Sequence, residues 1–490
     1  MIAVLRRVGL AWGLVLVTAL PVSAALPGNV RAAVDAMLAC ERPGGGWTYS
    51  CNPATGPDGA VTWPLIRAAE VAGPLGLADW DVAVLRSPGT PAAGLVLVQA
   101  WRLGGDPRDL AAARRAGDLL IDLQLYSGGW FSEVPVHGTQ PAAWFTAIAH
   151  WTTLDDDVTS GAVRFLLALH EATGDRRYRD AAERGLDLLL AAQLPSGAWP
   201  LTWRRPWLVR LRPNFEDWAS TNDLATAGPI LALLDGARVL GRPEFLTAAR
   251  RGGAWLARAQ GPPPQAGWAQ QYDPAGRPGP GRRFEPAAYA TWETREMADA
   301  LLALARVTGE RSFCAPLAGA VDWLVRSATG PGCWARFRAP GTNEPVYVGA
   351  DGQPVESAEQ AKRPYRWVGD YGIPGFLASL GLDEAGRPLA ADAAARVPRR
   401  IPGDPGYCPE DVRFAKAYRV HPRLRIAHAA TLLMALAPPP PSPCSVSAPT
   451  GGATPTARSA GEPQLNGQTS PSPAPKQPRT AGSGALSSSG

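Results

Sequence analysis

Hydrophobic positions recur with helical spacing through most of the chain. Apolar residues lie three and four positions apart, as in Leu186, Leu189 and Leu190, which is the pattern of an amphipathic helix. No stretch shows a convincing alternation of period two, the pattern of a half-buried strand. The body of the chain is therefore predicted to be all-α.

Four segments share one layout: a helix, a turn with glycine, a second helix and a loop that ends in tryptophan. The turns contain Gly105, Gly174, Gly241 and Gly309, and the tryptophans are Trp130, Trp199, Trp268 and Trp334. These tryptophans are 69, 69 and 66 residues apart, and a half-copy ends at Trp47. Successive helical hairpins with short turns stack side by side and curve into a toroid. We therefore predict an α/α toroid, an incomplete α/α barrel of repeated hairpins, with a plain α-solenoid as the alternative.

The two ends of the chain differ from this body. Arg6 and Arg7 precede a short apolar run that ends in small residues before Ala24, which is typical of a cleaved signal peptide. From Pro438 onward Pro, Ser, Gly and Thr dominate, a composition typical of disorder. We predict a signal peptide over 1–24, a toroidal catalytic domain over 25–436 and a disordered tail over 437–490. The mature protein is expected to be secreted, extracellular or periplasmic, without a membrane span.

Charge and cysteine content exclude several classes of protein. The net charge is +5, but the two ends supply most of it, so the balance does not indicate a nucleic-acid partner. The six cysteines are too few for a disulfide-built scaffold and include no CxxC pair, which argues against a metal role. Export permits disulfides, and the natural guesses are 40–51 and 314–333, although sequence alone does not fix the connectivity.

Acidic residues gather at equivalent places in two repeats. Asp156 and Asp223 each lie 18 residues before the turn glycine of their own hairpin, so both are predicted at one end of the toroid. One interpretation is helix N-capping, which we weigh for Asp157. Capping does not explain three consecutive acids, Asp155 to Asp157, whose mutual repulsion needs a counter-charge. Oxygen ligands from two loops suit Ca²⁺, so the second interpretation is a calcium site.

At this point the residues resemble the family 10 pectate lyases, secreted calcium-dependent enzymes with an α/α toroid. The resemblance covers roughly residues 140 to 370. The segments that carry it are 333–337 (CWARF), 340–347 (PGTNEPVY), 351–352 (DG), 163–166 (VRFL), 193–200 (QLPSGAWP), 217–223 (DWASTND) and 282–286 (RRFEP). These seven segments form four matches that follow one another along a helical repeat, and together they are strong evidence for the resemblance.

The resemblance implies cleavage of polygalacturonate by calcium-assisted β-elimination. The C5 proton of a uronate is very weakly acidic, so the adjacent carboxylate must first be neutralised by Ca²⁺ and guanidinium groups. The resemblance assigns the role of base to Arg282. An arginine has a pKa above ~12, so its surroundings must lower that pKa strongly for this role. The remaining roles that we assign are substrate binding by Arg336, Asp155, Asn343 and Trp199, and calcium binding by Asp155, Asp156 and Asp223. We expect a monomer whose partner is an acidic polysaccharide.

Three positions depart from the family pattern. Asp156–Asp157 replaces the usual Asn-Gly, Ala350 stands where the family has an arginine, and Glu344 stands where it often has a basic residue. Loss of positive charge weakens the binding of a polyanion. These departures favour a less charged uronate polymer, such as methyl-esterified pectin, or a low activity.

Two functions from other classes remain open. A non-catalytic uronate-binding surface protein would keep the toroid without the full chemistry. A terpenoid cyclase is suggested by Gln124-x-x-x-Gly128-x-Trp130 and Gln193-x-x-x-Gly197-x-Trp199, which fit the QxxxGxW motif of that α/α fold. The acids do not form the D-x-D-D of those cyclases. For the tryptophans themselves, packing against a helix end is the main alternative to sugar binding.

Overall fold

The computed structural model describes a large part of the body of the chain. The described residues are 25–42, 44–47, 81–137, 140–141, 151–204, 213–362 and 365–389, with single positions between 408 and 446 (408, 426, 429–430, 432–433, 436, 442–444 and 446). The chain divides into two units, residues 1–449 and 450–490, and all described residues belong to the first. The predicted signal peptide and residues 447–490 of the predicted tail lie outside the described residues.

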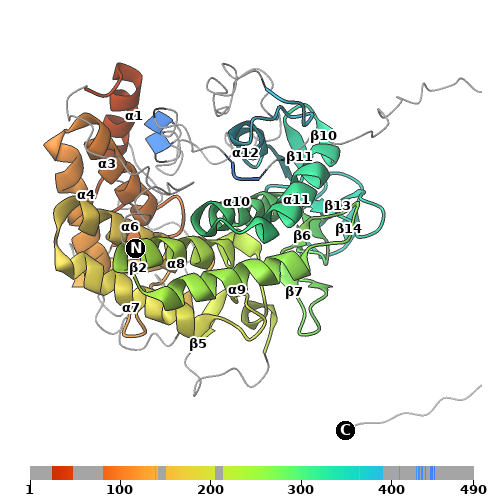
Figure 1. Cartoon of the computed structure of the whole chain (residues 1–490), viewed down its shortest axis with the longest axis horizontal. Helices are drawn as coiled ribbons and strands as arrows, with labels where there is room; N and C mark the ends of the chain where they lie inside the picture. Colours follow the sequence, from red (N-terminus) through yellow and green to blue (C-terminus); the bar gives the residue numbers. More distant parts are fainter. Residues whose placement is uncertain are drawn as a thin grey trace, which may run out of the picture. The chain divides into compact units, whose positions relative to one another are not determined.

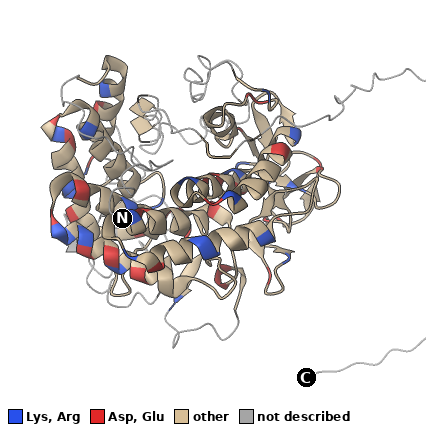
Figure 2. Cartoon of the chain, in the orientation of Figure 1, with Lys and Arg blue, Asp and Glu red and all other residues tan. Residues whose placement is uncertain are grey.

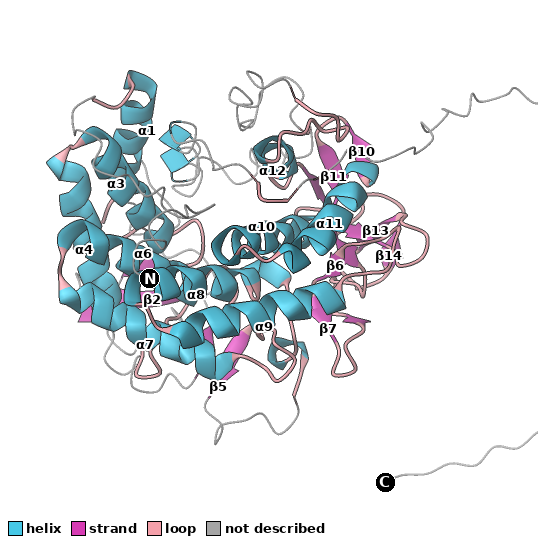
Figure 3. Cartoon of the chain, in the orientation of Figure 1, coloured by secondary structure: helices cyan, strands magenta, loops and turns pink. Residues whose placement is uncertain are grey.

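The described residues form four helical hairpins in two layers, as predicted (Figures 1 and 3). The first helices are α3 (Thr90–Gly104), α6 (Val158–Thr173), α8 (Ala227–Leu240) and α10 (Thr291–Thr308). The second helices are α4 (Pro107–Leu123), α7 (Arg176–Ala192), α9 (Pro243–Ala259) and α11 (Cys314–Arg326). Each first helix packs on the next along the chain and on its own second helix. This arrangement of inner and outer helices is the α/α toroid that the repeat predicts. The N-terminal helix α1 (Gly28–Leu38) packs against α3.

Burial follows the two layers. The inner helices α6 and α8 are buried along nearly their whole length, whereas the outer helices α7 and α9 alternate buried and charged positions. Figure 2 shows this contrast, with charged residues along α4, α7 and α9 and few on α6 and α8. The core therefore runs between the layers and through the inner one. Among the described residues, no helix has the length and apolarity needed to cross a membrane.

The repeated tryptophans hold successive hairpins together. The indole Nε1 atoms of Trp130, Trp199 and Trp268 each donate a hydrogen bond of 2.8 Å to a carbonyl near the end of the preceding outer helix. Their backbone N–H groups donate to a threonine of the next inner helix or just before it: Thr159, Thr226 and Thr294. Trp47 makes the equivalent pair of bonds, to Met37 O and Thr90 Oγ1. The packing interpretation of these tryptophans is therefore confirmed, and the half-copy is a true repeat.

Short strands occupy the loops, which the sequence pattern did not reveal. They are β1 (Asp81–Val84), β2 (Glu133–His137), β3 (Gln140–Pro141), β4 (Trp151–Thr153), β5 (Thr202–Arg204), β6 (Trp268–Ala269), β7 (Gln271–Tyr272), β8 (Pro278–Gly279), β9 (Tyr289–Ala290), β10 (Ala328–Gly330), β11 (Cys333–Ala335), β12 (Phe337–Arg338), β13 (Pro345–Val348), β14 (Pro354–Val355) and β15 (Val368–Gly369). The largest sheet has the order β14-β13-β12-β9-β6 and is antiparallel throughout. It lies next to α10 and pairs β12, which directly follows Arg336, with β9, which directly precedes α10. The remaining elements are the short helices η2 (Phe215–Asp217), η3 (Asn222–Leu224), η4 (Arg311–Phe313) and α12 (Ile373–Ser379).

The disulfides correct one sequence-based prediction. Cys314 is bonded to Cys444 and Cys333 to Cys408, so the expected 314–333 bridge is wrong. Cys314 begins the 13-residue helix α11, and Cys333 lies beyond its end in β11, so the helix, about 20 Å long, carries the chain away from Cys314 before Cys333 is reached. Cys40 is also disulfide-bonded, but its expected partner Cys51 lies outside the described residues. Cys444, which we had placed in the tail, is buried and covalently tied to the body.

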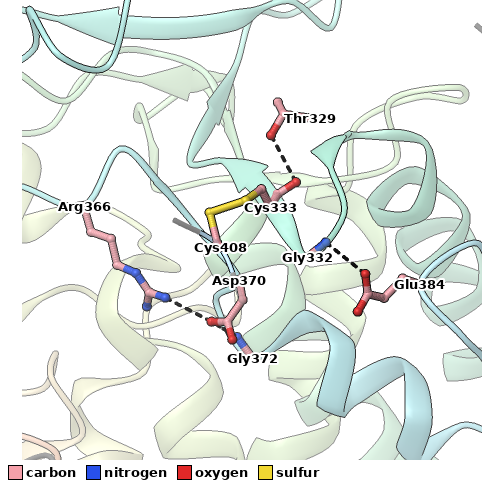
Figure 4. Close-up of a disulfide and its surroundings, with 8 residues drawn as sticks. All are labelled: Thr329, Gly332, Cys333, Arg366, Asp370, Gly372, Glu384 and Cys408. Carbon is pink, nitrogen blue, oxygen red and sulfur yellow. Dashed lines mark hydrogen bonds and ion pairs between the residues drawn. A yellow bond between two sulfur atoms is a disulfide. The ribbon is translucent and has the colours of Figure 1, made fainter. Parts of the chain in front are cut away.

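Figure 4 shows where the second bridge acts. Cys333 lies in β11, the strand that leads directly into Arg336, and β11 pairs with β15 next to Asp370. Arg366 bonds Asp370 at 3.0 Å, and the Gly332 N–H donates to Glu384 at 2.9 Å. The disulfide and these polar contacts fix the strand that presents Arg336.

Candidate active site

Three aspartates lie at the start of two neighbouring inner helices. Asp155 and Asp156 precede α6, and Asp223 lies in η3 just before α8. Asp156 and Asp223, the equivalent pair of the repeat, both adopt left-handed backbone conformations, with φ of 54° and 45°. Such conformations are uncommon outside glycine and are costly, though aspartate tolerates them better than most residues. The two repeats thus bend their backbones in the same way where these carboxylates are presented.

Two arginines flank Asp223. The Arg282 Nη2 atom is 3.8 Å from Asp223 Oδ2, and the Arg336 Nη2 atom is 3.7 Å from Asp223 Oδ1. Both distances exceed a normal hydrogen bond. Asp223 therefore lies between the two guanidinium groups without a bonded pair to either.

Arg282 is held by the segment that follows it. Its Nη2 atom is 2.7 Å from Glu285 Oε1, and its backbone N–H donates to Glu285 Oε2 at 2.8 Å. The Tyr365 hydroxyl donates to Glu285 Oε1 at 3.1 Å. Glu285 is buried, while the Arg282 side chain is 48% exposed. A buried carboxylate thus anchors one side of a guanidinium that remains open to solvent on the other.

Arg336 is more deeply buried, with a side chain only 4% exposed. Its Nη2 atom donates to Glu293 Oε1 at 2.5 Å, and its guanidinium lies 4.8 Å from the ring centroids of both Trp292 and Tyr365. Aromatic faces attract a cation and also exclude water from it. Arg336 is therefore a rigid, partly desolvated cation beside Asp223.

A glutamine joins the third and fourth repeats at this point. The Gln270 Nε2 group donates to Glu293 Oε1 at 2.6 Å and to Asn222 Oδ1 at 2.8 Å. Asn222 directly precedes Asp223, so the bond links the Asp223 loop to the acid that holds Arg336. The geometry of Asp223 and Arg336 is thereby coupled through buried groups.

The counter-charge expected for the three consecutive acids is Arg86. Its Nη1 atom is 3.4 Å from Asp156 Oδ2, and its Nε atom is 3.2 Å from Glu133 Oε1. The structure therefore brings together residues from five separate segments: Arg86, Asp155–Asp156, Asp223, Arg282 and Arg336. Of the sequence-predicted site residues, five lie in this cluster.

The cluster carries more negative charge than its arginines offset. Burial, together with the charge of Asp156, raises the pKa of Asp223 to about 7, although Arg336 and Arg282 oppose this shift. Burial and the neighbouring Asp156 and Asp223 raise the pKa of Asp155 well above its usual range. In contrast, the Glu285 carboxylate raises the pKa of Arg282, which desolvation alone would lower. The raised pKa values mean that Asp155 and Asp223 hold protons more readily than ordinary aspartates, whereas both arginines stay protonated.

The donor chemistry of these acids fits a hard divalent cation. Carboxylate oxygens are the ligands that Ca²⁺ prefers, and the mutual repulsion of Asp155, Asp156 and Asp223 is what a cation would relieve. Among the described residues, however, no group of three or more His, Cys, Asp and Glu side chains is arranged to hold a metal ion. These side chains alone do not form a complete coordination shell, so ligands from substrate or water are needed.

Two predicted substrate-binding residues do not lie in the cluster. Trp199 is 0% exposed and donates to Leu189 O, so its predicted stacking on a sugar ring is wrong for this structure: the ring is enclosed by the core. The Asn343 amide accepts from Trp323 Nε1 at 2.9 Å and Gln265 Nε2 at 3.3 Å, and donates to Ser327 at 3.3 Å. That side chain organises its own turn, and its role in substrate binding stays a prediction.

Asp157 is not the helix cap that we weighed. Its side chain makes no capping bond, and its backbone has a φ of 54°. The carboxylate instead lies over Gly161 and Gly228, where an added Cβ would come within 3.0 and 3.3 Å of its oxygens. Burial, opposed by Arg164, raises its pKa to about 6. Asp157 is a buried acid at the contact of α6 and α8.

Sequence reasoning assigned no role to several residues of the cluster. Glu285 was visible within the RRFEP segment, and Glu293 was noted near the start of the fourth inner helix, but neither showed its arginine partner. Gln270 follows Trp268 in a segment that also resembles the family, but its bonding role was not visible there, and Arg86 and Tyr365 carried no signal because each is far in sequence from its partners. Only the fold identifies them.

Comparison with known proteins supports the pattern read from the sequence. Residues 136–238 match the family model described as pectic acid lyase. This segment contains Asp155, Asp156 and Asp223, and the match supports a lyase that acts on polysaccharides. Among curated proteins, none matches the chain.

Several solved structures are similar at low identity. Family 10 polysaccharide lyase from Cellvibrio cellulosa, as a variant in complex with trigalacturonic acid, is 20% identical, with a TM-score of 0.45 and coverage of 60% of this chain and 98% of that one. Another structure of this lyase is 19% identical, with a TM-score of 0.44 and coverage of 58% and 93%. A sugar epimerase from a ruminal bacterium is 12% identical, with a TM-score of 0.49 and coverage of 65% and 77%. The resemblance to pectate lyases predicted from the sequence is confirmed by the family model over residues 136–238.

Proposed function

We propose that the protein cleaves pectate (polygalacturonate), or a related uronate polymer, by calcium-assisted β-elimination. The observation that supports this most directly is the position of Asp223 between Arg282 and Arg336, in a cluster where burial and Asp156 raise the pKa of Asp223. A uronate carboxylate needs cations on both sides before its C5 proton becomes acidic enough to remove. This cluster offers two guanidiniums and a set of acids suited to a third cation.

Asp155, Asp156 and Asp223 would hold Ca²⁺ together with the substrate carboxylate. When bound, the ion would act as a Lewis acid on that carboxylate. Arg336, buried between two aromatic rings, would bind the same carboxylate through its N–H groups, because a planar guanidinium matches a carboxylate. Glu293 and Gln270 would keep Arg336 in place during binding.

In the elimination a base removes the C5 proton, the electron pair forms the C4–C5 double bond, and the C4–O bond breaks as the leaving oxygen takes up a proton. We assign the base to Arg282, the exposed guanidinium next to Asp223. In the free protein Glu285 and Asp223 raise the pKa of Arg282, which opposes this role. The assignment therefore requires that substrate and cation binding weaken those interactions before proton transfer.

We also propose that the protein is exported. Disulfides persist in oxidising compartments, and the described residues include two complete bridges besides the bonded Cys40. The apolar segment that precedes residue 25 is the expected signal. Detection of the mature chain in the culture medium or periplasm would test this.

The test of activity is direct. Purified protein is mixed with polygalacturonate, and the absorbance of the C4–C5 unsaturated product is followed with added Ca²⁺ and with a chelator. We expect product that depends on Ca²⁺ and that Arg282→Ala abolishes, while Arg311→Ala, an exposed arginine in η4 between α10 and α11, leaves the rate unchanged. Absence of product with intact, folded protein would refute the lyase.

One observation favours a second candidate, a non-catalytic uronate-binding protein. The firmly protonated Arg282, paired with the buried Glu285, is better suited to binding an anion than to taking a proton. The same assay separates the two functions. Binding of polygalacturonate without unsaturated product would support the binding protein and exclude the lyase.

A further inference from the structure

Lys362 lies beside the exposed arginine of the cluster. The sequence contains 48 basic residues, of which only Lys362, Lys416 and Lys476 are lysines. The Lys362 Nζ atom is 3.8 Å from the centroid of the Phe284 ring, and the Arg282 guanidinium carbon is 5.6 Å from the same centroid. The two cations are therefore separated by no more than the sum of these distances.

The position of Lys362 is fixed by its surroundings. Its backbone N–H donates to Val348 O at 2.8 Å, and its carbonyl accepts from Trp367 Nε1 at 2.9 Å. The Phe284 ring beneath it meets Tyr365 edge to face at 4.9 Å. Tyr365 in turn bonds Glu285, the partner of Arg282. Lys362 and Arg282 thus belong to one framework.

Within the part of the chain that the structure describes, Lys362 forms no ion pair with a carboxylate. The nearby Glu285 is already engaged by Arg282 and by Tyr365. Partial burial and the charge of Arg282 lower the pKa of Lys362, so the two cations repel each other. A bound anion would relieve that repulsion.

A third cation adjoins this pair. Arg283 is exposed, and its side chain lies against the turn at Gly352, where an added Cβ would come within 2.8 Å of Arg283 Cγ. No ion pair of Arg283 with a carboxylate is found among the described residues. Lys362 and Arg283 thus add positive charge near Arg282, whose own guanidinium is partly neutralised by Glu285.

We propose that Lys362 binds the carboxylate of a second uronate, adjacent to the uronate bound at Arg282 and Arg336. This inference rests on the proposed acidic polysaccharide substrate and deepens it: the site would select two consecutive unesterified uronates. A methyl ester is neutral and would gain little from the lysine, since an ammonium group recognises charge. Such a preference for free carboxylates is opposite to the preference for an esterified polymer that Ala350 and Glu344 favour from the sequence.

The experiment compares Lys362→Met, Lys362→Arg and the matched control Arg311→Met. Binding of each full-length chain to polygalacturonate and to highly methyl-esterified pectin is measured by affinity electrophoresis. We expect Lys362→Met to weaken polygalacturonate binding about tenfold, with a much smaller effect on esterified pectin, and Lys362→Arg to retain most of the affinity. Arg311→Met removes the same charge elsewhere and should change neither affinity.

Kinetics provide a second readout, because a merely structural role would not separate KM from kcat. For Lys362→Met we expect a higher KM for polygalacturonate with kcat largely retained. Equal losses on both polymers, or unchanged polygalacturonate binding, would overturn the role of Lys362. If the wild-type protein binds polygalacturonate but forms no unsaturated product, the lyase fails while the Lys362 comparison still decides this inference. A wild-type protein that binds no polygalacturonate would overturn both.

Discussion

The two ends of the inner helices are built in opposite ways. At one end α3, α6, α8 and α10 close on glycines with nearly identical left-handed conformations: Gly105, Gly174, Gly241 and Gly309, with φ of 71°, 72°, 70° and 73°. At the other end the loops differ in length, carry short strands and contribute different charged residues. The turns thus have the same geometry in all four hairpins, whereas the loops at the other end share the tryptophan–threonine bonds but differ in most of their charged residues.

This difference separates the parts that hold the fold from the parts that carry chemistry. The Gly turns, the Trp anchors and their threonines recur because each hairpin must bury the same kind of face. In the cluster, Asp156 and Asp223 are equivalent positions of neighbouring repeats, whereas Arg86, Arg282 and Arg336 are added by three further loops. Changes to the charged cluster should therefore affect activity, whereas changes to the repeated Gly, Trp, Thr and Gln positions should affect stability.

The largest expected effect is from Arg336→Ala. Removal of this guanidinium leaves Glu293 buried without its partner and takes away one of the two cations beside Asp223. We expect kcat/KM on polygalacturonate to fall about a thousandfold, the usual scale for loss of a transition-state contact. Rates are measured by product absorbance, after circular dichroism has shown a folded chain. A loss of less than tenfold in kcat/KM would contradict the role of Arg336 in binding the substrate carboxylate.

Glu296 allows a test by pH. It lies on α10 three residues after Glu293, and burial raises its pKa to about 8 despite Arg295. The Arg295 guanidinium is closer to Asp299, at 2.9 Å, than to Glu296, at 3.4 Å. Between the unfolded pKa near 4.5 and about 8, the folded state holds a proton that the unfolded state has released. The free energy of unfolding should therefore fall as pH rises through this window, by at most about 1.4 kcal/mol per pH unit.

Glu296→Gln keeps the shape and removes the titration. We expect the variant to match the wild type near pH 4.5 and to be more stable at pH 9, as measured by urea unfolding at both values. Equal stability differences at the two pH values would mean that Glu296 remains ionised in the folded protein, with Arg295 as an effective counter-ion.

The turn end was predictable from the sequence and the loop end only in part. Helical periodicity, turn glycines and the spacing of tryptophans together specify the hairpins, because all three are local signals. The strands were missed because most contain two to four residues, too few for a period-two pattern. Disulfide partners were missed because Cys314 and Cys444 are 130 residues apart, and no local rule links them.

For the candidate site, the repeat itself supplied the useful signal. Equivalent positions placed Asp156 and Asp223 on one end, and the segments around Arg282 and Arg336 resembled a known family. The prediction that Trp199 binds a sugar ring was wrong, because a repeated tryptophan is compatible with both packing and sugar binding. Partners such as Arg86 and Glu293 depend on which loops the toroid brings together, and that information is tertiary.

A smaller loss of stability is expected from Gln193→Ala. The Nε2 group of Gln193 donates to Gly197 O at 2.8 Å and to Ala248 O at 2.9 Å, and so ties its own loop to the next outer helix. Gln124 and Gln260 make the same pair of bonds in neighbouring repeats. Loss of two partly buried hydrogen bonds should cost about 2 kcal/mol in the free energy of unfolding. Gln124→Ala should cost a similar amount, and kcat of the folded variants should not change. A lower kcat in these variants would contradict the separation of fold-stabilising residues from the candidate site.

The smallest effect is expected at the turn glycines. An added Cβ at Gly174, Gly241 or Gly309 would meet nothing within 4 Å, so substitution by alanine introduces backbone strain alone. Each variant should lose about 1 kcal/mol of unfolding free energy, the cost of a left-handed conformation for an L-residue. Because the three turns have the same geometry, the three losses should agree, and kcat per folded molecule should not change.

Gly197→Ala is the matched contrast: its Cβ would lie 2.5 Å from Arg251 O, so its loss of unfolding free energy should exceed the other three. Unequal losses among Gly174→Ala, Gly241→Ala and Gly309→Ala would show that the turn end is not the uniform structure that its backbone angles indicate.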